Sequence, residues 1–67
     1  MNENKFSPRA EEALRLSQEA AGELGHGYVG TEHLLAGILR EGNNMAVRIL
    51  RTAGVDARHL YTALMQK

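Results

Sequence analysis

The sequence contains no cysteine and no tryptophan, and its only aromatic residues are two tyrosines and one phenylalanine. The missing cysteines exclude a disulfide framework and a thiolate zinc site. Eight basic residues balance eight acidic ones, so the chain lacks the positive excess that is typical of nucleic-acid binders. No apolar run is long enough to span a membrane, and Met1–Lys5 lacks the apolar core of a signal peptide. We therefore expect a soluble protein of the cytoplasm.

The length of 67 residues allows one small domain and excludes a nucleotide-driven motor, a Rossmann enzyme or a barrel enzyme. A chain of this size buries only about 60% of its unfolded surface. We therefore expect a marginal core, to which a partner or a second copy contributes.

Small and apolar residues recur at helical spacing from Pro8 to Leu24, which predicts a first helix. Ser7 before Pro8 is typical of an N-cap followed by the first helical residue. Gly25 ends this helix, and two glycines make residues 26–30 a loop.

We expect Thr31 to cap a second helix that ends at Gly42. The charge of Glu32 in the first turn suits the helix dipole. Gly37 inside this helix costs about 1 kcal/mol relative to alanine, which close approach of another helix would explain. The predicted buried stripe consists of Leu34, Leu35, Ile38 and Leu39.

Asn43 or Asn44 is expected to cap a third helix that Gly54 closes, and Asp56 to cap a fourth. The residues predicted to face inward are Met45, Ala46, Ile49, Leu50 and Ala53 in the third helix, and Leu60, Tyr61, Leu64 and Met65 in the fourth. No segment alternates with period two for the length of a strand. The predicted fold is therefore all-α, a compact arrangement of four helices.

Three histidines, His26, His33 and His59, raise the question of a metal site. No His-Glu-x-x-His pair is present, and a closed zinc site would need ligands from three separate elements. We therefore expect solvated or capping histidines, with no metal and no cofactor.

The sequence offers little evidence for catalysis or for DNA binding. Neither Ser7 nor Ser17 lies in a nucleophile turn, so we expect no catalytic residue and no enzyme. The turn at residues 40–44 followed by Arg48 and Arg51 has some helix-turn-helix character. A neutral chain lacks the counterion release that drives DNA binding, so we expect no nucleic-acid partner.

Two further features have both a structural and a functional interpretation. If the first two helices start close together, the Ser7 hydroxyl and backbone N–H groups would suit a phosphoryl group, and the Glu32 carboxylate a guanidinium. Helix capping explains Ser7 and the helix dipole explains Glu32 equally well. Tyr28 and Val29 either form a groove for apolar peptides or cover the core.

Three stretches of the sequence resemble the N-terminal domain of the Clp AAA+ unfoldases, most closely the ClpC type. They read Phe6-Ser7-Pro8-Arg9-Ala10, then LGHGYVGTEHLLAGI from Leu24 to Ile38, then Arg40-Glu41-Gly42. The likeness extends from about Phe6 to Leu64. It implies an all-helical, non-catalytic domain that receives substrate and adaptor proteins for an attached ATPase ring in proteolysis and the stress response.

The resemblance also implies a phosphoarginine pocket. In ClpC-like members, the residue matching Glu32 meets the guanidinium, and a hydroxyl residue matching Ser7 helps to hold the phosphoryl group. Backbone donors near Thr31 would join them. Ser7 stands where the ClpC pattern commonly has threonine, so a methyl contact is lost.

The family's domain contains two tandem repeats, whereas residues 1–67 correspond to one, with 1–6 expected to be a flexible N-terminal segment. A lone repeat would leave an apolar face exposed, so we expect a homodimer in which a second copy replaces the second repeat. The alternative is a free-standing regulatory or interaction protein that acts on a Clp machine in trans.

Overall fold

The computed structural model describes residues 5–66 and contains four helices and no strand in that range. The helices are α1 (Pro8–Glu23), α2 (Thr31–Glu41), α3 (Met45–Thr52) and α4 (Ala57–Leu64). This confirms the predicted all-α fold and the four helices. Most of the expected flexible segment, residues 1–4, lies outside the described residues. No helix of the described part is long and apolar enough to cross a membrane.

Three of the predicted caps are confirmed. The Ser7 hydroxyl accepts a hydrogen bond from an α1 amide at 3.1 Å, and the Asn44 side chain accepts one from an α3 amide at 2.8 Å. Asp56 caps α4 in the same way at 3.1 Å. Gly42 follows α2 with a φ of 76°, a left-handed conformation that glycine adopts without strain.

The start of α2 differs from the prediction. Thr31 is the first helical residue, and the N-cap is Gly30, which has no side chain to accept a hydrogen bond. Instead, the ring Nδ1 of His33 accepts a hydrogen bond from the Gly30 amide at 2.7 Å. A residue inside the helix therefore satisfies the backbone at its entrance.

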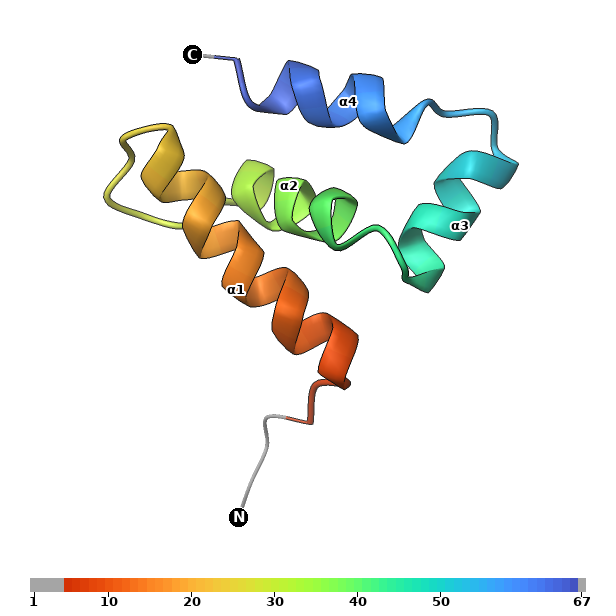
Figure 1. The fold of residues 1–67 in the computed structure, drawn as a ribbon, viewed down its shortest axis with the longest axis horizontal. Coiled ribbons are helices and arrows are strands. Elements are labelled where there is room, and N and C mark those ends of the chain that lie inside the picture. The colour runs from red at the N-terminus through yellow and green to blue at the C-terminus, as the bar shows by residue number, and fades with distance from the viewer. Residues whose placement is uncertain (1–4, 67) are drawn as a thin grey trace.

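Helix α2 occupies the middle of the fold and contacts each of the other three helices (Figure 1). Helix α1 packs along one side of it, and α3 leads from its end into α4, which runs back past it in the opposite direction (Figure 1). The described chain measures 39 × 31 × 14 Å. It is a thin slab, so little of the chain lies far from solvent.

The core is small and rich in alanine. The buried apolar residues are Ala13, Leu16, Ala20, Ala21, Ala36, Leu39 and Val47, and the buried polar residues are Ser17 and His33. Helices α1 and α2 supply all of these except Val47, and α4 supplies none. This distribution agrees with the marginal core expected from the chain length.

Gly37 lies where α2 crosses α1. A Cβ atom there would overlap the backbone oxygen of Ala13 and would lie 2.7 Å from the backbone nitrogen of Ser17. Close helix approach is therefore the reason for a glycine inside α2, as the sequence suggested.

Several predicted core positions are wrong. Met45 and Ile49 are 62% and 61% exposed, because α3 turns Val47 toward the core instead. Leu34 is exposed on α2, while His33, which was expected to be solvated or to cap a helix, is completely buried. The face of α2 that meets α1 is thus displaced from the predicted leucine stripe.

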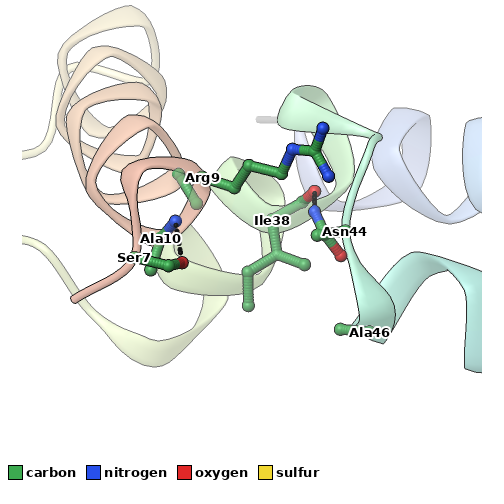
Figure 2. A pocket seen from close by; sticks show the side chains of 7 residues that line it. Ser7, Arg9, Ala10, Ile38, Asn44 and Ala46 are labelled. Atoms are coloured by element: carbon green, nitrogen blue, oxygen red, sulfur yellow. Dashed lines mark hydrogen bonds between the residues drawn. The ribbon is translucent and has the colours of Figure 1, made fainter.

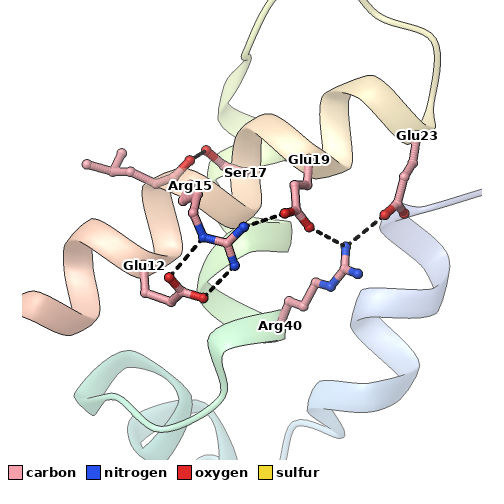
Figure 3. A network of polar contacts seen from close by, with 7 residues as sticks. Glu12, Arg15, Ser17, Glu19, Glu23 and Arg40 are labelled. Carbon is pink, nitrogen blue, oxygen red and sulfur yellow. Dashed lines mark hydrogen bonds and ion pairs between the residues drawn. The ribbon is translucent and has the colours of Figure 1, made fainter.

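A network of exposed ion pairs follows α1 and reaches α2 (Figure 3). Arg15 pairs with Glu12 at 2.7 Å and also with Glu19, and its hydrogen bond lowers the pKa of the Glu12 carboxyl. Arg40 of α2 pairs with Glu23 at 3.0 Å. Exposed pairs contribute little stability, so this network adds little to the contact between the two helices.

Candidate functional site

The loop of residues 26–30 and the start of α2 form an aromatic cluster. The rings of His26 and Tyr28 stack with their centroids 5.3 Å apart. The ring of His33 meets both edge-on, at centroid distances of 4.9 and 5.4 Å. The cluster therefore holds the loop against the first turn of α2.

A chain of hydrogen bonds runs through this cluster. Nδ1 of His33 accepts a hydrogen bond from the Gly30 amide. A neutral His33 ring therefore carries its proton on the other nitrogen, Nε2. That nitrogen lies 2.8 Å from Nδ1 of His26, which accepts the hydrogen bond. The burial of His33 is thus compensated at both ring nitrogens, which explains how a polar ring occupies the core. The expected capping role holds for His33, and His26 and His59 are exposed as expected.

His26, Glu32 and His33 bring possible metal-ligand atoms within 4.8 Å of one another. The sequence suggested that three separate elements would be needed, whereas these residues come from one loop and one helix turn. Metal-bound histidines ordinarily donate their second ring N–H, but His33 accepts at that nitrogen. Its Nε2 would have to lose the last ring proton before it could bind a metal. The donor chemistry therefore does not fit a metal site.

Glu32 is exposed at the second position of α2. The amide N–H groups of Thr31 and Glu32 have no acceptor within the helix, as in any first helical turn. The carboxylate bends back toward the cap, as its Oε1 lies only 2.5 Å from where a Cβ atom on Gly30 would be. A negative carboxylate and two free amide donors therefore lie side by side at this helix start.

Ser7 lies at the other end of α2. It lines a pocket of about 170 Å³ together with Arg9, Ala10, Ala13, Ile38, Asn44 and Ala46 (Figure 2). Ile38 follows Glu32 by six residues, which corresponds to about 9 Å along the helix. The start of α1 thus faces the end of α2, so the two helices do not start together. Within one chain, Ser7 and Glu32 lie in separate places.

Tyr28 and Val29 are 60% and 44% exposed. The contacts described for the Tyr28 ring are with His26 and His33. The Tyr28 ring thus covers part of the buried His33, while most of its own surface stays exposed. Their exposure leaves an aromatic and an aliphatic side chain available at the loop surface.

An apolar groove between α1 and α2 continues from the Ser7 pocket. It has a volume of about 210 Å³ and is lined by Phe6, Ala10, Ala13, Leu14, Leu34 and Ile38. Sequence reasoning placed Leu34 in the core and gave Phe6 no part in a site. Leu34 and Ile38 lie at i and i+4 on one helix face, and this spacing was the sequence signal that could have indicated the groove.

The fold and these surfaces define a small all-helical domain, with an apolar groove and a polar helix start as its main features. Residues 5–67 match the family described as the Clp repeat (R) N-terminal domain. The chain belongs to this family, as the resemblance in its sequence indicated.

The chain is similar to chaperone proteins of the ClpC type. It is 49% identical over 61 residues to the chloroplastic ClpC of Pisum sativum, and 48% identical over 61 residues to the chloroplastic ClpC1 of Oryza sativa subsp. japonica. It is also 48% identical over 61 residues to a ClpA homolog of Porphyra purpurea, an ATP-binding subunit of an ATP-dependent Clp protease. Each match covers 91% of this chain but only 7% of the relative.

Proposed function

We propose that this chain is a non-catalytic module that receives substrate or adaptor proteins for a ClpC-type unfoldase. The observation that carries the proposal is the start of α2, where the Glu32 carboxylate lies beside the free amide donors of Thr31 and Glu32. Membership of the Clp repeat family and the chaperone names of its relatives support this role.

The ligand proposed for this helix start is phosphoarginine on a protein substrate. Its guanidinium meets the Glu32 carboxylate, and its phosphoryl group meets the amide N–H groups at the positive end of α2. One P–N bond joins the two ligand groups, so both fit at a single helix start. Ser7 is too far along α2 to contact the same ligand within one chain.

In this proposal, a second copy of the chain covers the apolar groove. A thin slab with a small core gains most from a partner on the face that carries the exposed Phe6 and Leu34 and the half-buried Leu14. A two-fold axis through this face would run the two α2 helices in opposite directions. It would then bring Ser7 of one copy toward Glu32 of the other, completing the pocket that the resemblance implies.

The exposed loop residues Tyr28 and Val29 are proposed as an additional contact for apolar peptide segments. The same module would act on a Clp machine in trans if it occurs as a free-standing protein. A cytoplasmic location stays a prediction, since several of the relatives carry chloroplastic names.

The phosphoarginine proposal is tested by an amide NMR titration with free phosphoarginine, and with arginine and phosphate as separate controls. We expect saturable shifts at residues 31–33 that Glu32→Gln abolishes. The matched control is Glu11→Gln, which removes an exposed carboxylate without a described ion pair in the first turn of α1. Absence of shifts at residues 31–33 with millimolar ligand would contradict phosphoarginine binding there.

The dimer is tested by light scattering over a range of concentrations. We expect Leu34→Arg to give a monomer, because it places a charge in the groove. Ile49→Arg serves as the control, since Ile49 is exposed on α3 away from the groove. A wild-type chain that stays a compact monomer at high concentration would rule out the second copy.

A further inference from the structure

A second surface, on the other side of α2, concentrates arginine residues. An open pocket of about 440 Å³ lies between α2, α3 and α4. Its lining residues are Leu39, Arg40, Arg51, Ala57, Arg58 and Tyr61. None of them lines the groove or the helix start described above, so this pocket is a separate feature.

The three arginines reach the pocket from three different helices. Arg40 is in the last turn of α2 and Arg51 in the last turn of α3, while Arg58 is the second residue of α4. The loops after α2 and α3 turn the chain so that these positions meet, although they are well separated in sequence. This convergence is a property of the fold and not of a run of basic residues.

The charges in this pocket are only partly compensated. Arg40 pairs with Glu23 at 3.0 Å and approaches Glu19 at 3.9 Å, and both contacts use its Nη1 atom. Arg51 and Arg58 have no ion pair in the described part of the chain. The nearby acid Asp56 caps α4 through the amide of His59.

The uncompensated charge is local, because the chain as a whole is neutral. Two guanidinium groups without carboxylate partners leave an excess of about two positive charges beside an apolar floor of Leu39 and Ala57. A single carboxylate would neutralise half of this excess. A dianionic oxyanion would neutralise all of it, and its oxygens match the fork of donors on each guanidinium.

We propose that this pocket binds a phosphate group, with Arg51 and Arg58 as its main ligands. The Nε and Nη2 atoms of Arg40 have no described acceptor and supply further donors. Tyr61 borders the same space. The phosphate group is either free inorganic phosphate or a phosphate monoester carried by a partner protein.

The experiment is an NMR titration of the ¹⁵N-labelled chain at constant ionic strength and neutral pH. The ligands are inorganic phosphate, a short phosphoserine peptide, and acetate as a monovalent control. We expect saturable shifts of the Arg51 and Arg58 Nε–H signals with the two phosphate ligands and none with acetate. Tighter binding of the peptide would assign the site to a protein-borne phosphate, and equal binding to the free anion.

Arg51→Gln combined with Arg58→Gln should raise the Kd by about tenfold or more, because both charge-assisted forks are lost. Arg48→Gln is the matched control: Arg48 is also exposed on α3 but borders a different surface. Circular dichroism of each variant is the check that its helices are retained. The double variant lacks the Arg51 and Arg58 side-chain signals, so its Kd is read from the Nε–H signal of Arg40, which lines the same pocket, and from the backbone amides of residues 51 and 58. Shifts that do not saturate or that acetate reproduces would overturn the proposal, as would an unchanged Kd in the double variant.

This proposal stands independently of the phosphoarginine site. Signals of residues 31–33 report on the start of α2, and the arginine Nε–H signals report on the pocket. Glu32→Gln should affect only the start of α2, and the double arginine variant only the arginine pocket. Loss of binding at one site can therefore be detected while the other site still binds.

Discussion

Replacing Gly37 by alanine tests how α1 and α2 pack. The new Cβ atom would lie 2.7 Å from the backbone nitrogen of Ser17 and 3.0 Å from its Cα, and would overlap the backbone oxygen of Ala13. Ordinary contacts of this kind are about 3.5–4 Å, so α1 and α2 must separate by about 1 Å. No side-chain rotation relieves the overlap, because the opposing atoms belong to the backbone.

Two opposing effects set the size of the change. Alanine gains about 1 kcal/mol over glycine in helix propensity. Overpacking ordinarily costs about 1–3 kcal/mol, and the upper end applies because a whole helix pair has to shift. We therefore expect Gly37→Ala to lower the free energy of unfolding by about 2 kcal/mol net. A domain of this size has a total stability of about 3–10 kcal/mol, so the loss is a large fraction of it.

Gly22→Ala is the matched control. Gly22 lies near the end of α1, and a Cβ atom there would meet nothing within 4 Å. The same substitution should therefore stabilise the chain, by up to about 1 kcal/mol. Urea unfolding followed by circular dichroism measures both. Equal or greater stability of Gly37→Ala relative to the wild type would refute the reasoning.

Three further predictions concern stability. Ser7→Ala should lose about 1 kcal/mol in urea unfolding because the α1 cap is removed, whereas Ser7→Thr should lose much less. His33→Ala should lower the free energy of unfolding by about 2–4 kcal/mol, because it opens a cavity and leaves the Gly30 amide without its acceptor. The control His59→Ala, at an exposed position, should change it little. The hydrogen bond from Arg15 lowers the pKa of Glu12 in the folded state. Their pair therefore stabilises the folded chain at pH values above the ordinary glutamate pKa. This contribution is lost as pH falls through the lowered value, and Glu12→Gln should make unfolding between about pH 6 and 3 less pH-dependent.

The helices and most of their caps were predictable because these signals are local. Ser7 before Pro8, Asn44 before α3 and Asp56 before α4 each act on amides three residues away. Gly37 was also interpretable, since a glycine inside an apolar helix has few structural explanations other than close packing.

The orientation of the short helix α3 was not predictable in the same way. Met45 and Ile49 share one face at i and i+4, and Val47 belongs to another. On a helix of eight residues, both faces carry apolar side chains, so periodicity alone does not choose between them. The contact of α3 with the end of α2 makes the choice, and that contact depends on the turn at Gly42.

The position of His33 depended on partners that periodicity ignores. Histidine is intermediate between the residues that are usually buried and those that are usually exposed, so the residue type alone did not predict burial. Here the Gly30 amide and the His26 ring satisfy both nitrogens, which makes burial possible. The separation of Ser7 from Glu32 had a similar origin, since it depends on how α1 crosses α2 and no local pattern encodes that crossing.

In this thin fold, the stability of the domain and the binding of a partner depend on the same two helices. Most buried side chains come from the contact between α1 and α2, and the apolar groove lies along those same two helices. A partner that covers Phe6 and Leu34 therefore enlarges the core that holds the chain together. Because such a partner binds only the folded state, it raises the free energy of unfolding in proportion to the logarithm of its concentration. If the partner is a second copy, the chain is most stable when concentrated, and its groove is uncovered only as the dimer dissociates.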